Sequence, residues 1–116
     1  MTSLFRSFRF AFEGAVYLLR TQFNARIHLA VAIVVIAAGF VFKLSAIEWC
    51  LIAFNIAFVW SAEAFNTAIE TLADRVTMER DPKIKIAKDV AAAATLFAAM
   101  CAAGTGLILF VPKIVN

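Results

Sequence analysis

Four polar side chains recur along one apolar stretch of the chain, and their spacing places them on one helix face. At 100° per residue, Glu70 and Asp74 lie within about 20° of Glu63, and Asn66 lies about 60° away. Glu63 lies about 10 Å deeper in the apolar stretch than Glu70, at ~1.5 Å per residue. We call the three carboxylates the carboxylate stripe. A carboxylate at membrane depth is costly and indicates a functional site.

Several roles suit this stripe. Glu63 could take a proton during a reaction or during transport, whereas a purely structural Glu63 would be protonated and hydrogen-bonded to a neighbouring helix. Glu70 and Asp74 alone would be ordinary solvated charges at a helix end. The residue types therefore favour proton chemistry at Glu63 without choosing among these roles.

A second polar feature lies where a basic loop meets the last apolar stretch. Lys88 could contact a phosphate, and paired carboxylates nearby could hold Mg²⁺, which prefers oxygen ligands and binds together with substrate phosphates. The alternative is that Lys88 and Asp89 are only the charged start of a helix. The chain contains no G-x-x-x-x-G-K-[ST] motif and no glycine-rich kinase loop, so a nucleotide site would be built at the membrane surface.

Three long apolar stretches must position these side chains, at residues 27–42, 49–69 and 90–111. Of the 116 residues, 64% are hydrophobic and 16% charged, against about 45–50% and about 25% in soluble domains. A membrane-spanning helix needs about 20 residues. The first stretch is shorter, so we expect its helix to continue into the flanking residues, with Arg26 reaching the interface. The pattern predicts an all-α membrane protein forming one domain over residues 1–116. A soluble, oligomeric helical bundle is the less favoured alternative.

An amphipathic helix is predicted before the first span, over about residues 4–20. Aromatic and aliphatic residues recur there every three or four positions, and arginines fall largely on the other side (Phe5, Phe8, Phe12, Ala15 and Leu19; Arg6, Arg9 and Arg20). An aromatic face opposite a basic face is typical of a helix that lies in the membrane interface. The alternative is an ordinary helix packed on the bundle.

The basic residues predict the orientation of the chain. They gather before the first span and between the second and third spans, while the other side carries only two (Arg6, Arg9, Arg20 and Arg26; Arg75, Arg80, Lys83, Lys85 and Lys88; Lys43 and Lys113). The positive-inside rule therefore puts the N-terminus in the cytoplasm and the C-terminus outside. No basic stripe is interleaved with aromatic residues, which argues against a nucleic-acid partner.

Two further patterns bear on packing. Ala94, Ala98, Ala102 and Gly106 form a ridge of small residues, which allows close helix approach in lipid. The two cysteines, Cys50 and Cys101, lie in apolar runs. We expect both to be small buried hydrophobes and not a disulfide or metal framework.

The residues of the stripe belong to a longer segment that resembles a known signature. Residues 62–75 read A-E-A-F-N-T-A-I-E-T-L-A-D-R and are similar to E-x-x-N-[ST]-A-[IL]-E-x-x-x-D of the prokaryotic diacylglycerol kinase / undecaprenol kinase family. The A-K-D at 87–89 and the segments at 11–14 and 25–29 also resemble that family. Residues 42–49 are similar to its Gram-positive-type branch, which prefers undecaprenol. The resemblance covers nearly the whole chain.

The resemblance implies a homotrimer in the bacterial inner (plasma) membrane. Each subunit would have an N-terminal surface helix and three spans, with active sites between subunits at the cytoplasmic face. ATP with Mg²⁺ would come from the cytoplasm and a lipid alcohol from the bilayer. By the same resemblance, Glu63 is the general base, Asn66 positions groups near it, and Glu70 is a metal ligand. Lys88, Asp89 and Glu79 would contact the nucleotide.

The chain departs from the family pattern at two positions. Gln22 stands where the family usually has a second metal-binding glutamate, and its amide oxygen can coordinate a metal but brings no charge. Asp81 stands where the family's loop often has histidine. Two rival functions therefore remain: an inactive relative acting as a membrane assembly protein, and a small proton-coupled transporter that uses Glu63. The apolar surface does not choose between diacylglycerol and undecaprenol.

Overall fold

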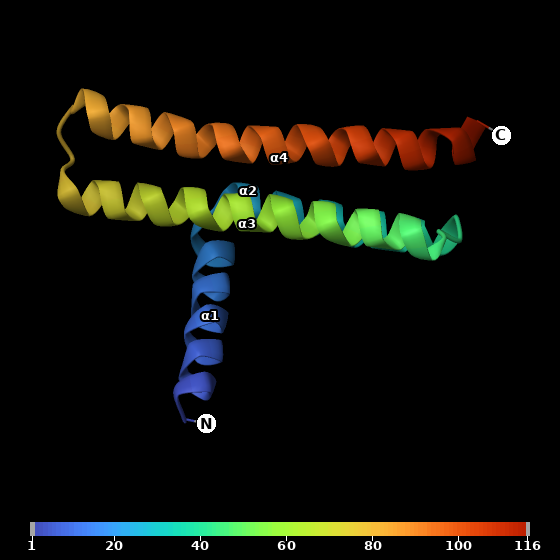
Figure 1. Cartoon of the computed structure of the whole chain (residues 1–116), viewed down its shortest axis with the longest axis horizontal. Coiled ribbons are helices and arrows are strands. Elements are labelled where there is room, and N and C mark those ends of the chain that lie inside the picture. The colour runs from blue at the N-terminus through green and yellow to red at the C-terminus, as the bar shows by residue number, and fades with distance from the viewer. Residues whose placement is uncertain (1, 116) are drawn as a thin grey trace.

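The computed structural model describes residues 2–115, which form four α-helices joined by short connections. The helices are α1 (Thr2–Thr21), α2 (Phe23–Val41), α3 (Ala46–Val76) and α4 (Pro82–Val115). Helices α2, α3 and α4 run side by side, whereas α1 projects away across the long axis of this bundle (Figure 1). The prediction of an all-α chain is confirmed.

Three of the helices are long and apolar enough to cross a membrane, namely α2, α3 and α4. Helix α2 begins at Phe23, ahead of the first apolar stretch, and Phe42 lies just past its end as the C-cap. Helices α3 and α4 contain 31 and 34 residues. At about 1.5 Å per residue each exceeds the ~30 Å hydrocarbon core, so each extends past it.

The turn between α2 and α3 is fixed by local hydrogen bonds. The Ser45 hydroxyl accepts from the Glu48 backbone N–H at 3.2 Å, and the Glu48 carboxylate accepts from the Ser45 N–H at 2.9 Å. This reciprocal pair is a capping box, which satisfies free N–H groups at the start of α3. The Lys113 ammonium donates to the same Glu48 carboxylate at 2.8 Å. The end of α4 is therefore tied to the α2–α3 turn.

Helix α3 packs mainly on α4, and small side chains make the contact. Ala98 of α4 is fully buried and forms a cluster with Val59 and Ala62 of α3, against which Ala102 also packs. Small side chains allow helices to approach closely. Two members of the predicted small-residue ridge thus lie at the α3–α4 interface.

Most large apolar side chains face outward, and none within residues 2–115 is fully buried. The two cysteines follow the same rule. Cys50 and Cys101 are free thiols and both are exposed, so the prediction that they are buried is wrong. An apolar exterior is what a helix bundle that spans a membrane presents to the lipid around it.

A single arginine fixes the junction between α1 and α2. Arg26 Nη1 donates to the backbone carbonyls of Leu19 and Arg20, each at 3.0 Å. Carbonyls at a helix C-terminus have no partner within the helix, and a cation there also complements the helix dipole. Arg26 therefore caps α1 and joins it to the start of α2.

Candidate functional site

Glu63 lies inside the bundle, with only 3% of its surface exposed. Its Oε2 lies 3.8 Å from Nε2 of His28 on α2. The neighbouring residue Ala62 packs in the α3–α4 cluster. A buried carboxylate requires a polar or charged partner, and the imidazole is the one that the structure provides. The Glu63 side chain is therefore shielded from the bundle's outer surface.

Asn66 and Glu70 follow Glu63 on the same side of α3, one turn and two turns further along. Asn66 Nδ2 donates to Glu70 Oε1 at 3.2 Å. The Asn66 Oδ1 atom is buried and has no hydrogen-bond partner among the described residues. The amide thus orients the Glu70 carboxylate, and its oxygen can accept a further bond.

Lys88 reaches back from α4 to the stripe. Its Nζ lies 2.5 Å from Oδ1 of Asp74 near the end of α3, with 37% of the Lys88 side chain and 47% of the Asp74 side chain exposed. The loop between the two helices thus brings together a lysine and a carboxylate from positions 14 residues apart. This pair connects the stripe to the charged end of the bundle.

Asp89 and Glu79 have partners other than Lys88 and Asp74. Asp89 accepts from Lys85 Nζ at 2.6 Å along the exposed side of α4. Glu79 is exposed in the α3–α4 loop, where its backbone N–H donates to Thr77 Oγ1 at 3.0 Å. Among the described residues, neither side chain is paired with Lys88.

Asp81 has a structural role that its sequence position also indicates. Its carboxylate accepts from the backbone N–H groups of Lys83 and Ile84, at 2.9 and 3.2 Å. This is the hydrogen bonding of an N-cap, and Pro82 follows as the first residue of α4, where proline is favoured. The departure from the family's histidine therefore supplies a helix cap here.

Gln22 lies at the junction of α1 and α2, as the residue that precedes α2. Its Nε2 donates to Thr21 Oγ1 at 3.3 Å, and its side chain does not cap α2. In residues 2–115 no three or more histidine, cysteine, aspartate or glutamate side chains cluster as a metal site would require. Gln22 and Glu70 are both half-buried oxygen donors, the donor type that suits Mg²⁺ when substrate phosphates complete its shell.

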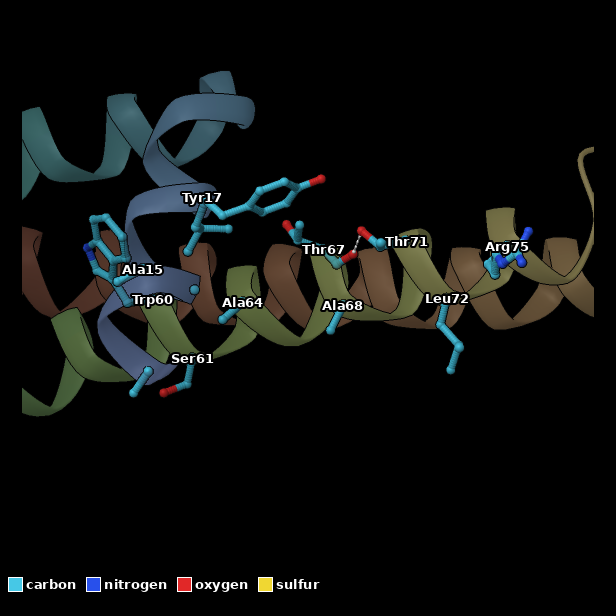
Figure 2. A pocket seen from close by; sticks show the side chains of 13 residues that line it. Ala15, Tyr17, Trp60, Ser61, Ala64, Thr67, Ala68, Thr71, Leu72 and Arg75 are labelled. Carbon is cyan, nitrogen blue, oxygen red and sulfur yellow. Dashed lines mark hydrogen bonds between the residues drawn. The ribbon is translucent and has the colours of Figure 1, made fainter. Parts of the chain in front are cut away.

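An apolar cavity of about 900 Å³ lies between α1 and α3, beside the stripe (Figure 2). Its walls are mostly small and apolar side chains: Ala11, Gly14, Ala15, Tyr17, Leu18, Trp60, Ser61, Ala64, Thr67, Ala68, Thr71, Leu72 and Arg75. Thr67, one turn after Glu63, is buried, and its Oγ1 has no hydrogen-bond partner among the described residues. The cavity thus passes close to the Glu63 level of α3 and ends at the positive charge of Arg75.

The sequence analysis assigned no role to His28, which the structure places beside Glu63. The segment around it contributed to the resemblance, but no role was predicted for the ring. A signal was present, because His28 is the only titratable residue of the apolar sequence between Arg26 and Lys43. Ionisable side chains within spans mark functional sites by default.

Comparisons with known proteins identify a family that this chain matches. The family described as prokaryotic diacylglycerol kinase matches residues 9–110. The undecaprenol kinase of Bacillus subtilis (strain 168) is 39% identical over 114 residues, which cover 98% of this chain and 93% of that protein. The diacylglycerol kinase of Synechocystis sp. is 36% identical over 115 residues, which cover 98% of this chain and 66% of that protein.

Proposed function

Because the chain belongs to the prokaryotic diacylglycerol kinase family, we propose that it is an ATP-dependent lipid kinase. It transfers the γ-phosphoryl group of ATP to the hydroxyl of a membrane lipid alcohol at the cytoplasmic face. One observation carries the proposal: a buried carboxylate, Glu63, lies on the same helix face as Glu70 and Asp74, with Lys88 held at the charged end of that face.

The proposed acceptor enters from the bilayer. The apolar cavity between α1 and α3 suits a lipid chain, and it lies beside the level of Glu63. A lipid hydroxyl stays near the headgroup region, so its base must lie just below the interface. The relatives are named for two such alcohols, undecaprenol and diacylglycerol. We propose the class of lipid alcohols and leave the choice between these two to the assay.

Glu63 acts in this proposal as the general base. It takes the proton of the lipid hydroxyl while the oxygen attacks the γ-phosphorus and ADP leaves. Asn66 holds the Glu70 carboxylate in place through its hydrogen bond. The Lys88 ammonium leaves its ion pair with Asp74 and binds the phosphates of ATP. Phosphoryl transfer depends on such positioning and charge stabilisation more than on covalent chemistry. Glu79 and Asp89 are proposed to contact the nucleotide.

A magnesium ion belongs to the same proposal, with Glu70 and Gln22 as its protein ligands. When bound, Mg²⁺ neutralises the developing charge on the transferring phosphoryl group. The oxygen donors at both positions fit that ion. Gln22 brings no charge, so the structure is compatible with weaker metal binding than a glutamate would give.

The proposed topology follows from charge and shape. Helix α1 carries aromatic residues and arginines and lies across the bundle axis, which suits a helix in the interface plane (Figure 1). The N-terminus and the α3–α4 loop are then cytoplasmic, and the α2–α3 turn and C-terminus face outward. A homotrimer with active sites between subunits completes the proposal.

The test is phosphate transfer from labelled ATP to diacylglycerol or undecaprenol by the purified protein in detergent micelles. Glu63→Gln is expected to lower the rate by about 10²–10⁴-fold, the usual contribution of a general base. Glu48→Gln is the matched control, because it makes the same chemical change at the opposite end of α3 and should keep the activity.

Two outcomes would contradict the proposal. If the wild-type protein labels neither lipid at any Mg²⁺ concentration, the inactive assembly protein suggested by Gln22 is favoured. If it labels neither lipid but carries protons into liposomes, and Glu63→Gln abolishes that flux, the transporter is favoured.

A further inference from the structure

A histidine on another helix lies within ion-pair distance of the proposed base. His28 Nε2 lies 3.8 Å from Glu63 Oε2, with 27% of the His28 side chain exposed and 4% of the Glu63 side chain exposed. The distance is within ion-pair range but exceeds that of a hydrogen bond. A hydrogen bond requires the two atoms to approach to within about 3.2 Å. Such contacts are often long without substrate and tighten in the reactive complex.

Among residues 2–115, no other lysine, arginine or histidine lies within ion-pair distance of Glu63. On α4, the residues that pack near this level of α3 are Ala98 and Ala102. On α2, the only charged side chain near His28 is that of Arg26, and its guanidinium is engaged by carbonyls of α1. On α1, Tyr17 lines the neighbouring cavity.

The stripe itself offers Glu63 no proton acceptor either. The Asn66 amide donates to Glu70 instead, and Glu70 lies about 10 Å further along α3 at ~1.5 Å per residue. Lys88 is paired with Asp74, beyond Glu70. His28 is therefore the group through which the buried carboxylate can exchange its proton.

We propose that His28 is a positioning residue that holds Glu63 in its ionised form and resets it after each turnover. This inference rests on the proposed kinase function. Glu63 takes the proton of the lipid hydroxyl as the new O–P bond forms and the bond to ADP breaks. The proton then passes from Glu63 Oε2 to His28 Nε2, which restores the carboxylate and gives an imidazolium. The imidazolium then gives the proton to water at the proposed cytoplasmic interface, since His28 lies in the second turn of α2.

Imidazole chemistry suits this step. Histidine exchanges protons near neutral pH, whereas a lone carboxylate in apolar surroundings holds its proton. In this cycle the ring must be neutral when it accepts the proton from Glu63, and it is an imidazolium only until it releases that proton. A ring that only filled space would not accept it.

The first test replaces His28 with glutamine, which keeps a polar side chain of similar size but cannot titrate. In the labelled-ATP assay, His28→Gln is expected to lower kcat by about 10–100-fold, with the KM values for ATP and lipid changed less than threefold. The pH profile of kcat/KM should also differ from that of the wild-type protein. Asn24→Ala is the control, because Asn24 is exposed one turn earlier on α2 and should leave both readouts unchanged.

A second test does not depend on how well glutamine is tolerated. His28 lines a cavity of about 560 Å³ between α2, α3 and α4, so a small ring can occupy the space left by His28→Ala. Added imidazole should restore the activity of His28→Ala at least fivefold, whereas pyrazole, of similar shape but much less basic, should not.

The outcomes separate this inference from the proposed function. Wild-type kcat and an unchanged pH profile in His28→Gln would overturn the role of His28, and so would His28→Ala that imidazole does not rescue. Either result alongside loss of activity in Glu63→Gln would leave the kinase intact. A wild-type protein without phosphotransfer would overturn the kinase itself.

Discussion

Replacing Asn66 with alanine should weaken the response of the enzyme to magnesium. The Asn66 amide donates to the Glu70 carboxylate at 3.2 Å, and Glu70 is the proposed metal ligand. Without the amide, the carboxylate is free to turn away, and part of the metal-binding energy is spent in restoring its orientation. The variant should therefore need more Mg²⁺ to reach half of its maximal rate.

The size of this effect follows from the geometry. A hydrogen bond to a charged acceptor contributes about 1.5–3 kcal/mol, but neighbouring pairs on an exposed helix face contribute only ~0.2–0.5 kcal/mol. The Asn66–Glu70 bond is partly buried and close to the upper limit of length, so we take an intermediate value of about 1 kcal/mol. Since 1.4 kcal/mol is a factor of ten, the half-saturating Mg²⁺ concentration should rise about fivefold.

The assay is the initial rate of phosphate transfer against free Mg²⁺ at saturating ATP and lipid. Asn55→Ala provides the control, because Asn55 is also an asparagine of α3 that donates within the helix and to Thr105. Its removal should leave the Mg²⁺ dependence unchanged. The reasoning is refuted if Asn66→Ala has the wild-type Mg²⁺ requirement, or if both variants shift it equally.

Two further predictions concern positions that the stripe does not include. Gln22→Glu adds the charge that the amide lacks and should lower the half-saturating Mg²⁺ concentration at least fivefold in the same titration; an unchanged requirement would remove Gln22 from the metal site. Gly39→Ala would place a Cβ 2.5 Å from a ring atom of Trp49, and overpacking of about 1–3 kcal/mol exceeds the ~1 kcal/mol gain in helix propensity. Thermal unfolding in detergent should therefore show destabilisation, whereas Gly104→Ala, with open space around it, should not.

The helices could be predicted from the sequence because their apolar stretches are long and uninterrupted. Their ends were harder to predict, since helices α3 and α4 continue into charged sequence that hydropathy treats as loop. The residues that cap the helices mark where α3 and α4 begin. Ser45 with Glu48 forms a capping box at the start of α3, and Asp81 before Pro82 caps α4.

The site could be predicted in part. Helical periodicity correctly placed Glu63, Asn66 and Glu70 along one side of α3, because that relation depends only on a single helix. The partners across helices could not be derived in this way, since they depend on how α2 and α4 rotate against α3. The pairing of Lys88 with Asp74, and the approach of His28 to Glu63, needed the three-dimensional structure.

The outward-facing apolar side chains have a consequence for how this protein should be handled. Even the best shielded positions, Ala25 and Ala98, are occupied by alanine, so the chain has little interior of its own to resist unfolding. The stability against unfolding that is measured for this protein will accordingly depend on the detergent around it as well as on the polypeptide. Values obtained in one micelle should not be compared with those from another, and exchanges among the lipid-facing phenylalanines, leucines and valines should have little effect in either.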